Sequence, residues 1–130
     1  MAVDRLFIYG TLLPGLVRPP LDELVARMPP LGPATVTGRL YDLGPYPGLV
    51  LDEQAASLVH GELFTLPDDP AILSALDEYE GSCLYRRVEC DAAKPNGKKL
   101  TCWVYECHAD LSRAVVIPDG DYRRWHTAKQ

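Results

Sequence analysis

The stretch YRRVECDAAKPNGKKLTCWVYEC, residues 85–107, decides which class of fold this chain adopts. At its centre stands Asn96-Gly97, the strongest short-range hairpin signal. The flanking segments, residues 85–91 and 99–107, are rich in residues that favour strands. We therefore predict two antiparallel strands joined by a hairpin.

Further short elements are predicted on the N-terminal side of this hairpin. Apolar and β-branched runs bounded by Gly or Pro indicate strands at residues 5–9, 34–43, 49–52 and 58–66. Gly38 is a candidate bulge in the second of these strands. A helix is expected at residues 21–28, where apolar residues recur at helical spacing between two Pro-Pro pairs.

A second helix is expected after residues 68–70, because the sequence Asp-Asp-Pro combines an acidic N-cap with a proline at the first helical position. This helix should end at Tyr79 or Glu80, with Gly81 as the residue after its C-cap. The tail, residues 119–130, could hold one last helical turn.

The expected order of elements is therefore β-α-β-β-β-α-β-β, which predicts an α+β fold. We expect a mixed, mostly antiparallel curved sheet or small β-barrel with a few packed helices. The 12 prolines and 10 glycines also argue against long helices. No repeat, linker or low-complexity segment interrupts the sequence, so residues 1–130 are expected to form a single domain.

The charge balance excludes several classes of partner. Thirteen Lys and Arg against 18 Asp and Glu give a net charge of −5, and no basic group is larger than a pair. We therefore expect the chain to bind neither nucleic acid nor anionic membranes. The first apolar run is too short for a signal-peptide core, so a cytoplasmic location is expected. The sequence does not indicate an oligomeric state.

The cysteines and histidines form no recognisable metal or redox motif. No pair among Cys83, Cys90, Cys102 and Cys107 has C-x-x-C spacing, and free thiols are expected in a reducing compartment. The three histidines are far apart in sequence. We predict that the protein uses no metal and no cofactor.

The first candidate site is the run Tyr9-Gly10-Thr11-Leu12, where a buried strand is expected to end. A glycine at this point lets backbone N–H groups face a pocket, and such groups suit a carboxylate or an oxyanion. Thr11 could add a hydroxyl donor. The alternative is an ordinary strand-to-loop turn, in which glycine serves only the backbone conformation.

The second candidate is Glu80, at the end of the second expected helix. At helical spacing Glu80 falls on the apolar arc formed by Ile72, Leu73, Leu76 and Tyr79. Glu78 faces solvent, and Asp77 lies on the border. Burial and the helix dipole would both raise the pKa of a carboxyl group placed there, as general acid/base catalysis requires. Alternatively, the helix ends at Tyr79 and Glu80 turns into solvent.

Two further candidates follow. Tyr85 or one of the adjacent arginines, Arg86 and Arg87, could orient an anionic substrate, although exposed strand residues of these types are common. Tyr122, in the sequence Gly-Asp-Tyr, could fold back onto a pocket, and the alternative is a frayed, solvated terminus.

Four of these segments together resemble the γ-glutamylcyclotransferase-like superfamily, in particular its small γ-glutamylaminecyclotransferase and AIG2-like branch. They are YGTLLPG at residues 9–15, PYPGLV at 45–50, LDEYEG at 76–81 followed by YRR at 85–87, and PDGDYRRW at 118–125. The similarity runs from Leu6 to Trp125. It implies the family's fold and a small-molecule γ-glutamyl substrate whose glutamyl group is cyclised to 5-oxoproline.

The resemblance also implies roles for individual residues. The backbone of Tyr9, Gly10, Thr11 and Leu12 would hold the α-carboxylate of the glutamyl group, and Glu80 would match the catalytic glutamate. Tyr85 would match a pocket tyrosine, and Tyr122 the aromatic residue of the tail motif.

After YGTL, small members of the family often carry polar residues, whereas this chain has Leu13-Pro14. The sequence therefore does not identify the amine that the reaction would release. Two alternative functions remain at this point. The chain could remove a γ-glutamyl protecting group from a biosynthetic intermediate, or it could be a non-catalytic small-molecule binding module on the same fold.

Overall fold

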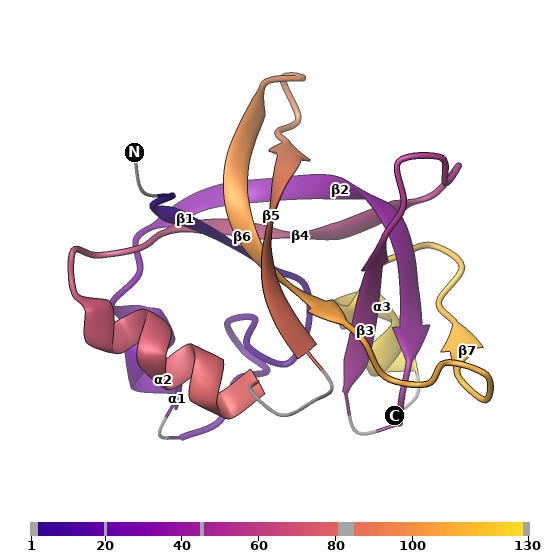
Figure 1. Cartoon of the computed structure of the whole chain (residues 1–130), viewed down its shortest axis with the longest axis horizontal. Helices are drawn as coiled ribbons and strands as arrows, with labels where there is room; N and C mark the ends of the chain where they lie inside the picture. The colour runs from indigo at the N-terminus through magenta and orange to yellow at the C-terminus, as the bar shows by residue number, and fades with distance from the viewer. Residues whose placement is uncertain (1–2, 20, 45, 81–84, 129–130) are drawn as a thin grey trace.

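A curved sheet closes into a small barrel in the computed structural model, which describes residues 3–19, 21–44, 46–80 and 85–128 and, at Glu80, the main chain alone (Figure 1). The strands in this part of the chain are β1 (Arg5–Ile8), β2 (Pro30–Asp42), β3 (Pro47–Leu51), β4 (Leu58–Thr65), β5 (Tyr85–Ala93), β6 (Lys99–Cys107) and β7 (Val115–Val116). The helices are α1 (Leu21–Ala26), α2 (Pro70–Glu80) and α3 (Tyr122–Ala128). The predicted α+β class and the first eight elements are confirmed.

The barrel runs in the order β1-β4-β2-β3-β6 and closes by pairing β1 with β6. Most neighbours are antiparallel, but Leu6 of β1 pairs with Trp103 of β6 in parallel, and Leu49 of β3 pairs with Glu106 of β6 in the same way. The sheet is therefore mixed, as predicted. β5 extends the sheet beyond β6, and β7 adds a short pairing to β2.

The close contact between β2 and β3 depends on Gly38. A Cβ atom at this position would lie 2.5 Å from the carbonyl oxygen of Val50, so no side chain fits there. The predicted bulge at Gly38 is wrong: the register shift of β2 lies between Pro30 and Gly32 instead. At Gly38 the long strand changes partner, since Thr37 pairs with β4 and Gly38 with β3.

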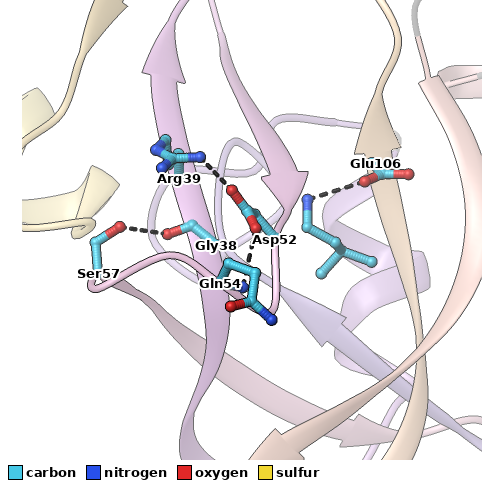
Figure 2. A network of polar contacts seen from close by, with 7 residues as sticks. Gly38, Arg39, Asp52, Gln54, Ser57 and Glu106 are labelled. Carbon is cyan, nitrogen blue, oxygen red and sulfur yellow. Dashed lines mark hydrogen bonds and ion pairs between the residues drawn. The ribbon is translucent and has the colours of Figure 1, made fainter.

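Side-chain hydrogen bonds hold the connection from β3 to β4 against the barrel (Figure 2). The Ser57 hydroxyl donates to the Gly38 carbonyl at 2.6 Å, and Arg39 pairs with Asp52. Across the seam between β3 and β6, the N–H of Leu51 donates to the Glu106 carboxylate at 2.9 Å. This bond supports a seam that has few backbone pairs.

The predicted hairpin between β5 and β6 is confirmed. Gly97 has a φ of 86°, and the N–H of Lys94 donates to the carbonyl of Lys98 at 2.8 Å. The Asn96 side chain accepts from the N–H of Lys98, which closes the turn.

Helices α1 and α2 cover the outside of β1, which is why this strand is buried on both faces. Phe7 faces the barrel interior, whereas Leu6 and Ile8 pack in a second cluster with Ile72 and Leu76 of α2. The side chain of Asp69 caps α2 by accepting from the N–H of Ala71 at 3.0 Å, as the acidic N-cap predicts. Within the described residues, no helix is long and apolar enough to cross a membrane.

Three local expectations are corrected or extended. β2 begins at Pro30, earlier than predicted, because a positive φ at Gly32 and the register shift admit prolines that an ordinary strand would exclude. β7 was not expected, and the tail forms a two-turn helix, α3. Of the four cysteines, the three in the described residues are free, and Cys83 lies outside them.

Candidate active site

A pocket of about 210 Å3 lies where β1 leaves the barrel. One wall is residues 7–12, the opposite wall is Tyr46 and Pro47 at the start of β3, and the rest is formed by Tyr79, Tyr85 and Tyr105. The structure therefore brings together five of the residues singled out in the sequence, namely Tyr9, Gly10, Thr11, Leu12 and Tyr85.

The strand-to-loop segment forms a tight turn that faces the pocket. The N–H of Leu13 donates to the carbonyl of Gly10 at 2.9 Å, which places Thr11 and Leu12 at the centre of the turn. Within the described part of the chain, the N–H groups of Thr11 and Leu12 have no acceptor. Two adjacent backbone donors beside a pocket can bind a carboxylate or a developing oxyanion.

Tyr9 anchors this turn to the barrel. Its side chain is buried, and its hydroxyl donates to the carbonyl of Tyr105 at 2.6 Å and accepts from the N–H of Leu49 at 3.2 Å. One phenol therefore joins the end of β1 to β6 and β3. Tyr9 thus lines the pocket and also holds together the three strands around it.

Tyr85 closes the pocket on the side of β5. Its hydroxyl donates to the carbonyl of Pro47 at 2.6 Å, and its ring meets Tyr46 edge to face at a centroid distance of 6.0 Å. These contacts fix the wall opposite the turn. They join the start of β5 to the start of β3.

The end of α2 lies at the rim of the pocket. Tyr79 lines the pocket and is 51% exposed. Helical spacing places it on the apolar arc of α2, but the side chain is not buried there as Ile72 and Leu76 are. The last turn of the helix is only partly covered, whereas Leu76 one turn earlier is fully buried. Glu80 is the final residue of α2, as predicted, but its side chain and Gly81 lie outside the described residues.

Asp77 accepts several hydrogen bonds, although helical spacing places it only on the border of the apolar arc of α2. It accepts two hydrogen bonds from Arg87, at 2.9 and 3.1 Å, and a third from the Tyr105 hydroxyl at 2.7 Å. Partial burial opposes its charge, but these hydrogen bonds outweigh that effect and hold the pKa of Asp77 below its usual value. Arg87 is thus paired with Asp77 in this structure. The periodicity of α2 could not reveal this, because the partners come from other strands.

Comparisons with known proteins show the family of the chain and its fold. The family model described as gamma-glutamyl cyclotransferase, AIG2-like, matches residues 6–124. The chain belongs to this gamma-glutamyl cyclotransferase, AIG2-like family. No curated protein matches the sequence.

Solved structures share the fold of this AIG2-like chain. An AIG2-like protein from Mus musculus has a TM-score of 0.76 at 20% identity, covering 94% of this chain and 89% of that one. A gamma-glutamyl cyclotransferase has a TM-score of 0.64 at 20% identity, covering 88% of this chain and 72% of that one. YkqA from Bacillus subtilis has a TM-score of 0.78 at 19% identity, covering 98% of this chain, which spans only 42% of YkqA.

Tyr122 is the one predicted substrate-binding residue that the structure does not bring to the pocket of this AIG2-like chain. It is buried and lines a neighbouring cavity of about 700 Å3. Thr11 and Tyr79 border both cavities. Among the described residues, no three His, Cys, Asp or Glu side chains gather closely enough to hold a metal ion.

Proposed function

We propose that this chain cyclises the γ-glutamyl group of a γ-glutamyl amine or peptide to 5-oxoproline and releases the amine. The observation that carries the proposal is one pocket that two features line together. One is the turn whose two N–H groups have no acceptor among the described residues, and the other is the last turn of α2, which ends at Glu80. Membership in the AIG2-like family supports the general activity.

In this proposal the glutamyl group enters the pocket with its α-carboxylate on the N–H groups of Thr11 and Leu12. A volume of about 210 Å3 suits a glutamyl group better than a larger ligand, because sites for drug-sized molecules are roughly 300–1,000 Å3. Tyr85 and Pro47 line the same pocket. Tyr122 does not line this pocket, so its proposed contact would be with the part of the substrate beyond the glutamyl group.

The reaction needs one proton to move between two nitrogen atoms. The α-amino nitrogen of the glutamyl group attacks its own γ-carbonyl carbon, which forms the ring C–N bond and places negative charge on the carbonyl oxygen. Glu80 takes the proton from the attacking nitrogen and gives it to the departing amine as the original C–N bond breaks. Because both reacting groups belong to one substrate, correct orientation supplies much of the rate.

The test compares two acids of the same helix. Glu80→Gln should lower the rate of 5-oxoproline release by about 10²–10⁴-fold, the usual contribution of a general acid/base. Glu78→Gln is the matched control, since Glu78 is exposed, lies two residues away and does not line the pocket. Because Glu78 borders the neighbouring cavity, the two variants are compared on a γ-glutamyl amine whose small amine does not extend into that cavity. Release is measured by mass spectrometry on γ-glutamyl amines, γ-glutamyl amino acids and glutathione, with circular dichroism to verify the fold.

Three outcomes separate the alternatives. Loss of turnover in Glu80→Gln alone supports the assignment. Near-wild-type release in Glu80→Gln removes Glu80 from the mechanism. A wild-type chain that binds these substrates without releasing 5-oxoproline is a binding module, and the proposed activity is then wrong.

A further inference from the structure

We propose that Asp77 is a positioning residue, which fixes the end of α2, and with it Glu80, against the strands that form the pocket. This inference rests on the proposed function. It assigns to Asp77 no contact with the substrate, because Asp77 does not line the pocket. Its role is to act through Glu80, three residues further along the same helix.

The carboxylate of Asp77 is held from two directions. Arg87 donates from Nε to Oδ1 at 2.9 Å and from a terminal nitrogen to Oδ2 at 3.1 Å. This two-pronged geometry fixes the orientation of a carboxylate as well as its distance. The Tyr105 hydroxyl adds a third hydrogen bond to Oδ1 at 2.7 Å.

Both donors lie on neighbouring strands of the sheet, β5 and β6. Arg87 and Tyr105 are directly paired across the β5–β6 ladder. The Arg87 guanidinium lies 4.3 Å from the centre of the Trp103 ring, a cation–π contact that restrains it further. Asp77 is thus bound to a pre-formed site on the sheet.

The same site is continuous with the pocket. Tyr105 lines the pocket, and its carbonyl accepts the hydrogen bond from the Tyr9 hydroxyl at 2.6 Å. Tyr9 directly precedes the turn at Gly10 that carries the unpartnered N–H groups. Asp77 therefore links the helix that bears Glu80 to the strand that sets the position of this turn.

The anchor matters because, among the residues that the structure describes, few others hold the end of α2. Its last turn carries the half-exposed Tyr79, whereas the buried residues Ile72 and Leu76 hold the earlier turns. Helix ends fray when they lack tertiary contacts. A catalytic group displaced by about 1 Å can lose about a hundredfold in rate.

The experiment uses Asp77→Asn, which keeps the size of the side chain and removes its charge. We expect kcat for 5-oxoproline release to fall about ten- to a hundredfold, while KM changes less than about threefold. Arg87→Lys, which keeps the charge and loses the two-pronged geometry, should act in the same direction and serves if Asp77→Asn does not fold. Asp69→Asn is the matched control, because Asp69 pairs with Arg27 at 3.0 Å at the other end of α2.

A double-variant cycle separates positioning from a merely structural role. If Asp77 acts through Glu80, adding Asp77→Asn to Glu80→Gln should not lower the residual rate further. Additive losses, or a wild-type kcat in folded Asp77→Asn, would overturn the inference while the proposed function stands. A wild-type chain without turnover overturns the proposed function first, and this inference with it.

Discussion

Gly10 and Pro47 approach each other so closely that a Cβ atom at Gly10 would lie 2.6 Å from Cγ of the proline. Both residues are buried and line the pocket. Pro47 therefore leaves no room for a side chain at position 10. This packing explains why the second residue of the YGTL run is a glycine.

Gly10→Ala should accordingly disturb the pocket more than the fold. The new methyl group must displace the Pro47 ring or the turn, so we expect kcat/KM for 5-oxoproline release to fall at least about tenfold, following the sensitivity of catalysis to small displacements. Steady-state kinetics on the folded variant measure this. Adding Pro47→Ala removes Cγ and should recover part of the loss; unchanged kinetics in Gly10→Ala alone would contradict the argument.

Gly120→Ala should destabilise the fold strongly. Gly120 has a φ of 66°, and a Cβ atom there would lie 1.9 Å from the carbonyl oxygen of Leu58. Left-handed backbone costs an alanine about 1–2 kcal/mol, and overpacking adds roughly 1–3 kcal/mol. Gly97→Ala is the control, because Gly97 also has a positive φ but nothing within 4 Å of its Cβ position. Urea unfolding should show a clearly larger loss of unfolding free energy for Gly120→Ala than for Gly97→Ala. Equal losses in the two variants would contradict the proposed clash with Leu58.

Leu76→Ala should loosen α2 from the barrel. Leu76 is 0% exposed and packs with Leu6 and Ile8 of β1. Truncation of a buried leucine costs about 2–5 kcal/mol, because a cavity remains. Leu73→Ala, at a partly buried position of the same helix, should cost less in the same urea titration. A loss below about 1 kcal/mol for Leu76→Ala would mean that the helix is not held by this contact.

The ion pair of Asp77 should contribute to stability only above acidic pH. The folded-state pKa of Asp77 lies below its ordinary value of 3.8, so its stabilising effect is complete above pH 3.8 and is lost as the pH falls through the folded-state pKa. Since 42% of the Asp77 side chain is exposed, the effect is small. Thermal unfolding of wild type and Asp77→Asn should differ at neutral pH and converge in strong acid. A constant difference across this range would contradict the assignment.

Local signals in the sequence predict most of the elements correctly. Asn96-Gly97 places the β5–β6 hairpin, and the acidic cap at Asp69 places the start of α2. Both are short-range features, because a turn and a cap depend on neighbouring residues alone. β7 has only two residues, too few for a periodic pattern, and its pairing with β2 is set by tertiary contacts.

The pocket is harder to predict for the same reason. The YGTL motif and Tyr85 could be selected as candidates, but the pairing of β1 with β6 that brings them together leaves no local pattern. Helical periodicity buries Tyr79, yet the neighbouring elements do not cover that side of α2. Helical projection places Asp77 on the border of the apolar arc, but it does not show which strands supply its partners.

The parallel pairing of Leu6 with Trp103 also has a consequence for how the chain folds. These residues are 97 positions apart, and Tyr9 and Tyr105 next to them are separated by 96. Contacts across so much chain carry a large loop-closure entropy, so they slow folding relative to helical proteins of similar size. During synthesis the pocket cannot assemble until β6 has emerged from the ribosome. β1 can pair with β4 and pack against α2 before then, but its edge facing β6 stays unpaired, and an unpaired strand edge favours aggregation.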